Sequence, residues 1–381
     1  MKCLIYFTHA ETLGETQRVL SIAKHLSKEN EVKIINAGPK FNLDLSEYDL
    51  VNMPFPLHNK ATLHDFLYKA VNTKIMKLRV LTLLKEVINF KPDIVIILSF
   101  PFQYVELKYE LIPLLKKLKS NNTKVICSLG YPLGFYGEDK NKIVDDFYDA
   151  ILIHCPEDLD SKYIKQYFGK SATLDYLSNR KNVYFTNYIL PIGSNLSNNV
   201  INQIMITRGS GIVGDEYMFK LIDGCLLTNL KIILVLGVSS ENELFNKINL
   251  KYEFEIKNGL LVLHTHLNQK EFTKTLSESE FSVSMCGYGT GVQLLYTNKT
   301  KSLLIPKPKN IDQEQYYRCN MLKDILGSRV IEFAEIEPEI IKTELDLLRN
   351  KDTTINLEWF KGLEKTEELL NDFIHNRFKD K

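Results

Sequence analysis

Apolar and polar positions in the first half of the chain follow a pattern typical of strands and helices that succeed one another. Short apolar runs predict strands at residues 2–7, 31–36, 93–99, 124–128 and 150–154. Apolar residues at helical spacing predict helices at 15–28, 72–89, 105–118 and 139–147. This order favours a parallel sheet with helices on both faces and right-handed crossovers.

The same alternation restarts after residues 189–199, which contain Pro191, Gly193 and a Ser/Asn-rich stretch. Strands are predicted at 203–207, 231–236, 260–263, 281–285 and 302–305. We therefore expect an α/β protein with two Rossmann-like, doubly wound domains, 1–190 and 201–356, joined by a linker at 191–200. Residues 357–381 read as a charged amphipathic helix, a candidate to pack back on the first domain.

Composition narrows the class of partner. The 381 residues are 44% apolar, enough for two cores, and 48 basic against 47 acidic residues leave a net charge of +1. This balance argues against nucleic-acid binding and favours small-molecule partners. Six cysteines without a C-x-x-C pair predict reduced, buried thiols. Residues 1–7 are too short for a signal peptide and no apolar run approaches a membrane span, so we expect a cytoplasmic protein.

The helix predicted at 72–90 leaves peripheral membrane attachment open. Basic and apolar residues are mixed along it: Lys74, Lys77, Arg79 and Lys85 among Ile75, Leu78, Leu81 and Leu84. Surface attachment to a membrane and packing on the sheet both explain this composition.

The most informative motif is Gly287-Tyr288-Gly289-Thr290-Gly291, a predicted turn between a strand and a helix. A helix entered through glycines presents unpaired N–H groups and its positive dipole end, which suit a phosphate, and Thr290 adds a hydroxyl. An ordinary tight turn is the alternative. A second such turn, Arg208-Gly209-Ser210-Gly211, precedes a helix predicted from about residue 215. Two turns of this kind can clamp the two phosphates of a nucleoside diphosphate.

The loop after the first strand, residues 8–18, gathers His9, Glu11, Glu15 and Arg18. Each has a purely structural interpretation, such as a strand cap for His9 or a first-turn carboxylate for Glu15. Their convergence in a loop at the carboxyl end of a strand favours function.

The chain resembles GT-B glycosyltransferases. The resemblance is carried by residues 100–102, 110–115, 124–129 and 282–290. The chain is most similar to predicted bacterial enzymes related to glycosyltransferase family 28, the group with the N-acetylglucosaminyl transferase of peptidoglycan synthesis. The resemblance implies an N-terminal acceptor domain and a C-terminal nucleotide-sugar domain that face each other across a cleft. It also implies inverting, metal-independent transfer from a nucleotide-diphosphate sugar, a UDP-sugar by analogy, with no further cofactor.

The family pattern also implies roles for individual residues. Phosphate contacts fall at the turn 208–211, which includes Ser210, and at Gly287, Gly289, Thr290 and Gly291. The nucleotide base falls at 264–268, which includes His266 and Leu267, and the sugar near Asp312 and Gln313. The family's Gly-x-Gly-His-x-x-Arg turn reads here as residues 12–18, so Gly14 and Arg18 match on the acceptor side.

Three positions depart from the family pattern: Thr12 replaces a glycine, Glu15 the histidine and Gln293 the ribose-binding glutamate. Glu15 is therefore the candidate base, because burial can raise a glutamate pKa from about 4.3. His9 competes for this role. Gln293 can still hydrogen-bond ribose as a neutral amide.

These departures keep other functions open. We expect a glycosyltransferase. Its acceptor is unidentified, because the expected acceptor loops, residues 55–67 and 129–139, contain no recognisable binding motif. A nucleotide-sugar hydrolase or 2-epimerase on the same fold is one alternative. A non-catalytic nucleotide-sugar-binding protein is the other. We expect no metal site, because no D-x-D carboxylate pair ends a predicted strand.

Overall fold

The chain divides into two compact units, and each is described by itself. The computed structural model describes residues 1–9, 14–40, 45–55, 73–130, 138–168, 177, 179–191, 196–197, 199–208, 217–237, 243–308, 313–349 and 353–375. Unit 1 comprises Met1–Ile189 and Glu358–Lys381, and unit 2 comprises Leu190–Leu357.

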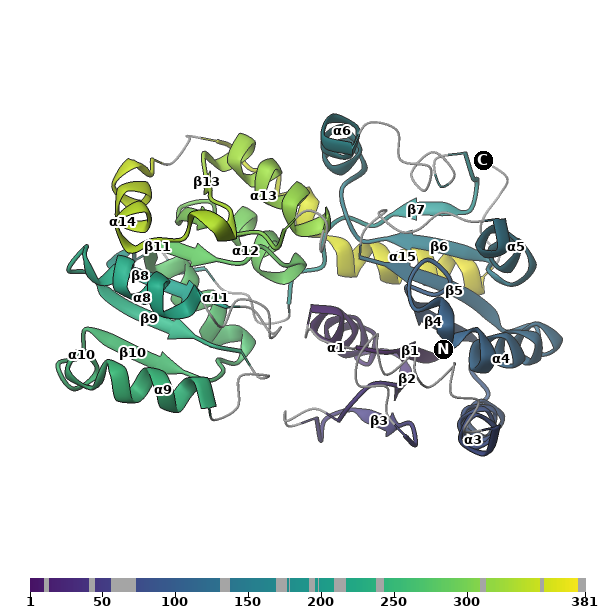
Figure 1. Cartoon of the computed structure of the whole chain (residues 1–381). Helices are drawn as coiled ribbons and strands as arrows, with labels where there is room; N and C mark the ends of the chain where they lie inside the picture. Colours follow the sequence, from purple (N-terminus) through teal and green to yellow (C-terminus); the bar gives the residue numbers. More distant parts are fainter. Residues whose placement is uncertain are drawn as a thin grey trace. The chain divides into compact units, whose positions relative to one another are not determined.

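Unit 1 contains a seven-stranded parallel sheet in the order β3-β2-β1-β4-β5-β6-β7. Its strands are β1 (Lys2–Phe7), β2 (Glu31–Asn36), β3 (Asp49–Asn52), β4 (Ile94–Leu98), β5 (Lys124–Leu129), β6 (Ala150–Ile153) and β7 (Val183–Phe185). The helices are α1 (Gly14–Leu26), α3 (Thr73–Phe90), α4 (Lys108–Ser120), α5 (Glu138–Phe147), α6 (Glu157–Phe168) and α15 (Gly362–Ile374), with 3-10 turns η1 (Val105–Leu107) and η4 (Leu357–Phe360) (Figure 1).

Unit 2 contains a six-stranded parallel sheet in the order β10-β9-β8-β11-β12-β13. Its strands are β8 (Ile201–Thr207), β9 (Lys231–Val235), β10 (Leu261–His264), β11 (Ser279–Ser284), β12 (Lys301–Leu304) and β13 (Arg329–Val330). The helices are α8 (Met218–Leu226), α9 (Glu243–Lys251), α10 (Glu253–Lys257), α11 (Gln269–Glu278), α12 (Tyr288–Thr297), α13 (Gln313–Leu326) and α14 (Pro338–Leu347), with the 3-10 turn η3 (Phe333–Glu335).

The predicted α/β class with two parallel sheets is confirmed, and the strands that sequence analysis missed lie at sheet edges. β3, β7 and β13 are the outermost strands of their sheets, and their residues are only partly buried. An edge strand shields little apolar surface, so it carries no continuous apolar run for a pattern to detect. The helix predicted at 105–118 is also divided, into η1 and α4.

The C-terminal helix α15 belongs to unit 1 (Figure 1). Leu370 and Phe373 share a buried cluster with β1 and α1, and the ring of His25 on α1 lies 2.8 Å from the carboxylate of Glu367. The burial of its apolar face therefore attaches α15 to the sheet of unit 1, although β1 and α1 lie at the opposite end of the sequence.

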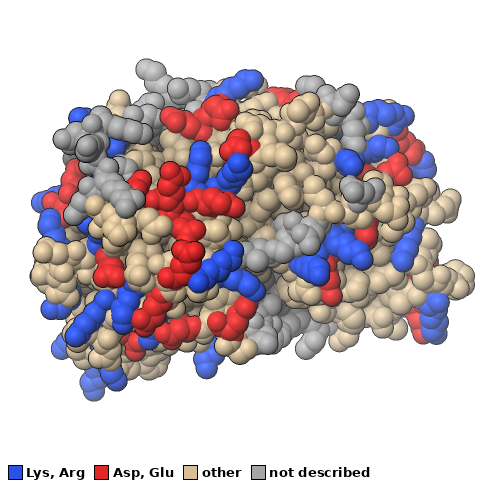
Figure 2. Space-filling model, turned by 180° about the vertical axis from the view of Figure 1, so that it is seen from behind, with Lys and Arg blue, Asp and Glu red and all other residues tan. Residues whose placement is uncertain are grey.

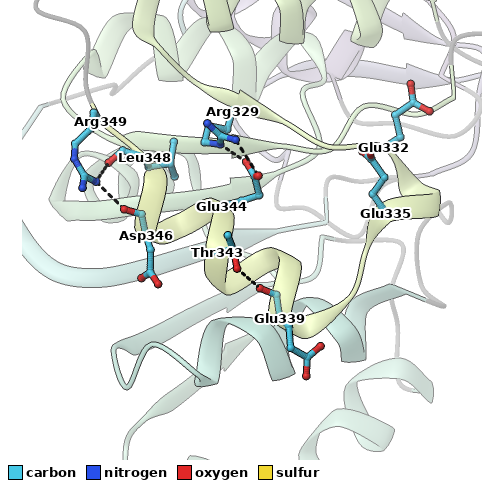
Figure 3. Close-up of polar contacts among 9 residues, drawn as sticks. All are labelled: Arg329, Glu332, Glu335, Glu339, Thr343, Glu344, Asp346, Leu348 and Arg349. Carbon is cyan, nitrogen blue, oxygen red and sulfur yellow. Dashed lines mark hydrogen bonds and ion pairs between the residues drawn. The ribbon is translucent and has the colours of Figure 1, made fainter.

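In unit 2, α14 is joined to the edge strand β13 by an ion pair. Arg329 Nη2 donates to Glu344 Oε1 at 2.9 Å, and Nε donates to the second carboxylate oxygen (Figure 3). Ile341 and Leu345 of α14 enter the core cluster shared with α8 and β8. Apolar burial and one forked ion pair thus hold this helix on the sheet.

Cysteine burial and surface charge agree with the sequence-based picture. All six cysteines are free and buried, and burial raises the pKa of the Cys3 thiol to about 12. Basic and acidic side chains are interspersed on the face drawn in Figure 2. Among the helices that the structure describes, none has the length and apolar character to cross a bilayer.

A fully buried ion pair anchors α3 to the core of unit 1. Arg79 Nε and Nη2 donate to the two carboxylate oxygens of Glu110 at 2.5 and 2.8 Å, and Nη1 donates to the carbonyls of Pro54 and Phe55. The hydroxyl of Tyr6 donates to the same carboxylate. Sequence analysis counted Arg79 with the surface lysines of α3, which is wrong, because this side chain is 0% exposed and points into the core.

A second buried polar network joins the carboxyl ends of three strands. The ring of His154, after β6, lies 2.8 Å from Ser128 Oγ on β5 and 2.7 Å from Thr186 Oγ1 after β7. Burial, with the positive charge of Arg18 as a second cause, holds the pKa of His154 well below its usual value near 6.5. The imidazole is therefore neutral.

We predict that Arg79→Met lowers the free energy of unfolding of unit 1 by about 3–5 kcal/mol, because the carboxylate of Glu110 stays buried without its partner. Urea unfolding followed by the fluorescence of Trp359, the single tryptophan of the chain and a residue of unit 1, measures this change. The control Lys24→Met removes the exposed pair with Glu47 and should cost less than about 1 kcal/mol. Equal effects of both variants would contradict the prediction.

We also predict that unit 1 loses stability as the pH falls below about 6.5. The depressed pKa of His154 means that the unfolded chain binds a proton that the folded chain does not. One such group contributes a slope of about 1.4 kcal/mol per pH unit below the unfolded pKa, with no contribution above it. His154→Asn should flatten the slope between pH 6.5 and 5.5, whereas His375→Asn, at an exposed position, should leave it unchanged. A slope insensitive to His154→Asn would exclude this residue as its source.

Candidate functional site

In unit 2, the glycine motif forms the start of α12. Gly287 is the N-cap residue with an extended backbone, and the first intrahelical hydrogen bond runs from Gly291 N to Gly287 O at 2.9 Å. The N–H groups of residues 288–290 precede this bond, so they point out of the helix start. The predicted turn at 287–291 is corrected, because Gly289, Thr290 and Gly291 lie in the first turn of the helix itself.

Gly287 and Gly289 are not required by the protein's own packing. A Cβ atom at either position would meet no atom within 4 Å, and neither residue has a positive φ. Glycine in a helix costs about 0.5–1 kcal/mol relative to alanine, so its use at Gly289 calls for a reason outside the helix. Open space above backbone N–H groups is the arrangement that a closely approaching anion needs.

Gly291 has a different explanation, because a Cβ there would lie 2.2 Å from Cδ of Arg318. The Arg318 side chain on α13 is 2% exposed, and its Nη1 donates to the carbonyl of Cys286 at 3.0 Å. Its guanidinium carbon lies 5.6 Å from the centre of the Tyr288 ring, and Nη2 pairs with Glu314. A buried cation therefore lies beside the start of α12.

Sequence analysis missed Arg318. The available signal was the spacing of Glu314 and Arg318, which are four residues apart on the helix that begins at Gln313.

The end of β8 lies beside the end of β11, since Thr207 is in register with Ser284. Ile204 and Ile206 enter the core cluster of unit 2, so Thr207 faces the opposite side of the sheet, on which α11 packs. The hydroxyl of Thr207 is buried and has no hydrogen-bond partner among the residues that the structure describes. Such a group costs about 1–3 kcal/mol unless it is satisfied, for example by a bound ligand.

Several residues predicted to contact the sugar donor lie outside the described residues or are described only in part. Gly209, Ser210, Gly211 and Asp312 lie outside the described residues, and of Gln313 only the backbone, which begins α13, is described. Arg208 directly follows β8 and is 1% exposed, and its backbone N–H donates to Val235 O at 3.3 Å.

The predicted base-binding loop follows β10. Leu236 N donates to His264 O at 3.0 Å, and Asn268 closes the loop as the N-cap of α11, in a reciprocal capping box with Glu271. His266 and Leu267 are half-buried in this loop, and burial lowers the pKa of His266. Base binding here stays a prediction.

Gln293 lies inside unit 2, on the buried side of α12. It is 3% exposed, and its Oε1 accepts a hydrogen bond from Thr273 Oγ1 at 2.8 Å. In this arrangement the amide oxygen links α12 to α11. Its ribose contact stays a prediction.

In unit 1, Glu15 is the second residue of α1, directly after Gly14, where a Cβ would meet no atom within 4 Å. Tyr104 donates to Glu15 Oε2 at 2.9 Å and Ser99 to Oε1 at 3.4 Å. Both donors have positive φ, 52° and 62°, a conformation rare outside glycine. The connection after β4 thus holds two hydroxyl donors against the carboxylate of Glu15.

His9 is placed differently from Glu15. It is 8% exposed, its Nε2 lies 2.9 Å from the carbonyl of Pro39, and burial lowers its pKa. Because a carbonyl only accepts, Nε2 carries the proton and donates it there. This geometry suits a structural contact between the ends of β1 and β2.

Arg18 is buried as well, at 5% exposure, and a Cβ at Gly130 would lie 2.2 Å from its Nη1. Its predicted place on the acceptor side stays a prediction. Within the described ranges, no cluster of three or more His, Cys, Asp or Glu residues has the geometry to hold a metal ion.

Sequence comparison finds neither a matching family model nor a matching curated protein. Structural comparison does find matches over nearly the whole chain. MurG from Acinetobacter baumannii is similar with a TM-score of 0.57 at 12% identity, covering 99% of this chain and 100% of that one. The UDP-GlcNAc 2-epimerase of Methanocaldococcus jannaschii, in complex with UDP-GlcNAc and UDP, has a TM-score of 0.58 at 12% identity, covering 97% and 99%.

The spinosyn rhamnosyltransferase SpnG, complexed with thymidine diphosphate, is similar with a TM-score of 0.57 at 10% identity, covering 97% of this chain and 96% of that one. Identities this low establish the fold alone. The two parallel sheets match GT-B structures, a fold shared by nucleotide-sugar glycosyltransferases and UDP-GlcNAc 2-epimerases.

Proposed function

We propose that this protein is a glycosyltransferase that takes its sugar from a nucleotide-diphosphate donor, with a UDP-sugar as the expected donor. The observation that carries the proposal is the start of α12, where Gly287 and Gly289 leave open space beside the N–H groups that precede the first intrahelical hydrogen bond. Two of the structurally similar proteins were solved with UDP or thymidine diphosphate.

Unit 2 supplies the groups that suit a diphosphate. The N–H groups at residues 288–290 and the dipole of α12 attract negative charge, and the hydroxyl of Thr290 adds a donor. Arg318 contributes a positive charge beneath this helix start and holds the carbonyl of Cys286 by a hydrogen bond. These groups stabilise a leaving diphosphate without a metal ion.

Unit 1 supplies the base in this proposal. The acceptor hydroxyl attacks the anomeric carbon as the bond from that carbon to the diphosphate breaks, and the nucleoside diphosphate leaves with the bonding electrons. The hydroxyl proton passes to Glu15, whose half-buried carboxylate is oriented by Tyr104 and Ser99. His9 is the weaker candidate, because its ring is buried and its Nε2 is bonded to Pro39.

A 2-epimerase or hydrolase activity is the second candidate, favoured by the equal similarity to UDP-GlcNAc 2-epimerases and glycosyltransferases. Incubation with UDP-GlcNAc in the absence of any acceptor separates these functions. Release of free sugar, or appearance of the 2-epimer in an NMR spectrum, would replace the transferase proposal.

We predict that Gly289→Ala weakens UDP binding while leaving the apo protein as stable as the parent or more so. The new methyl group enters space that the protein leaves open, and alanine favours a helix by about 0.5–1 kcal/mol over glycine. Thr290→Val should weaken UDP binding by about 1–3 kcal/mol, the range for a hydrogen bond to a charged group. Calorimetric titration and thermal unfolding measure the two effects.

The matched control for Thr290→Val is Thr343→Val on α14, which removes a hydroxyl that bonds only its own helix backbone. It should bind UDP like the parent. If Gly289→Ala and Thr290→Val also bind UDP like the parent, the start of α12 is not the phosphate site.

For the base, we predict that Glu15→Gln lowers turnover by about 10² to 10⁴, the usual share of general-base catalysis, with little change in UDP affinity. His9→Asn should cost less. Turnover is measured as UDP release from the UDP-sugar in the presence of the acceptor, after both variants are shown to unfold at the parent's temperature. Near-native turnover of Glu15→Gln would remove this residue from the mechanism.

A further inference from the structure

A single lysine is buried in the described part of the chain. Lys307, on the connection from β12 to α13, is 7% exposed. Lysine is rarely buried unless its ammonium is paired, because removing that charge from water is costly. The buried arginines Arg79 and Arg318 follow this rule and pair with Glu110 and Glu314. The ammonium of Lys307, in contrast, has no hydrogen-bond or ion-pair partner among the described residues.

The segment that carries Lys307 runs beside the start of α12. Strands β12 and β11 are parallel, with Leu304 in register with Ser284, and Ile305 N donates to Ser284 O at 3.0 Å. Continued to Lys307, this register brings it opposite Gly287, the N-cap residue of α12. Neighbouring strands lie about 4.8 Å apart, so the two backbones stay within reach of a lysine side chain.

Helix α13 holds the backbone of Lys307 in place. Lys307 N donates at 3.2 Å to Oε1 of Gln315, which is 8% exposed. Three residues further along α13, Arg318 donates to the carbonyl of Cys286 at 3.0 Å. Residues three apart lie on the same side of a helix, so one side of α13 contacts both the segment after β12 and the segment after β11. The backbone of Lys307 is therefore fixed next to the start of α12.

Lys307 supplies positive charge that the described residues around it do not neutralise. Arg318 pairs with Glu314 on its own helix, so that pair adds little net charge. The glycines at the start of α12 leave open space beside its N–H groups. The buried hydroxyl of Thr207, without a partner among the described residues, ends β8 on the other side of β11. An ammonium, helix N–H groups and a hydroxyl thus lie around the end of β11, and each can donate a hydrogen bond to an anion.

We propose that Lys307 binds the diphosphate of the sugar donor through its ammonium, as the main cationic contact to that group. This inference rests on the proposed donor site at the start of α12 and adds a residue to it. A diphosphate carries more than one negative charge, and the dipole of α12 offers only about half a positive charge, whereas Lys307 offers a full one. The bound diphosphate in turn gives the buried ammonium the acceptors that the described residues do not provide.

Calorimetric titration of UDP and of uridine into Lys307→Met tests this contact. Methionine keeps an apolar side chain and removes the charge, so we expect UDP to bind about 10- to 100-fold more weakly, the range for a hydrogen bond to a charged group. Uridine lacks the diphosphate and should bind the variant as it binds the parent. Lys307→Arg keeps the charge and should restore most of the UDP affinity. Without ligand, Lys307→Met should unfold at the parent's temperature or above, because it removes an unpaired buried charge.

The matched control is Lys301→Met, the same substitution at the other end of β12, where the lysine pairs with Glu280 at 2.7 Å. It should bind UDP like the parent. The inference is overturned if Lys307→Met also binds UDP like the parent, or if its uridine affinity falls as far as its UDP affinity. A lower unfolding temperature of ligand-free Lys307→Met overturns it as well, because the folded protein would then depend on this side chain for packing.

Inorganic pyrophosphate separates this inference from the proposed function. It offers a diphosphate without nucleoside or sugar, so the parent should bind it and Lys307→Met should bind it more weakly. If this holds but the parent binds neither UDP nor a UDP-sugar, the proposed function fails and the Lys307 contact stands. If Gly289→Ala weakens UDP binding but Lys307→Met does not, the Lys307 contact fails and the donor site stands. A parent that binds none of these ligands excludes both.

Discussion

Parallel pairing of the strands is the constraint on which the rest of this structure depends. The described pairs in both sheets are parallel, so each sheet brings the carboxyl ends of its strands to one edge. In unit 1 this edge carries the start of α1 with Glu15, and the connection after β4 with Ser99 and Tyr104. In unit 2 it carries Thr207 and the start of α12. Polar side chains and helix N–H groups that can bind a ligand gather at this edge, because loops and helix starts there replace strand pairing.

The buried arginines show how a fold can use a charge in two ways. The guanidinium of Arg79 donates to a carboxylate and to two carbonyls deep in unit 1. Its charge is therefore neutralised within the core, where the side chain has a structural role. Arg318 is also buried, donates to the carbonyl of Cys286 and pairs with the carboxylate of Glu314, which is 32% exposed. Its Cδ fills the space that a side chain at Gly291 would need, so this cation lies at the first turn of α12, where the helix dipole also favours an anion.

Single residues were harder to place from sequence than elements. Arg79 reads as one more basic residue of an amphipathic helix, yet its helical position turns it toward Glu110, 31 residues away. Gln293 is predicted to contact ribose, which stays a prediction, and the structure adds a hydrogen bond from Thr273 that the sequence did not indicate. For Arg318, the only indication in the sequence was Glu314 four residues earlier. In each case the decisive partner lies on another element, and a local pattern holds no information about which element packs alongside.

The sequence by itself determined the class of fold and the place of its main motif. Apolar periodicity and glycine preference are local properties, so they located most strands, the helices between them and the glycine run at 287–291. Only the tertiary structure decided which side chains meet: Tyr104 with Glu15 across 89 positions, and His25 with Glu367 across 342. These contacts follow from the order of strands and the packing of helices on each sheet face. That arrangement minimises exposed apolar surface over a whole unit, so no single segment encodes it.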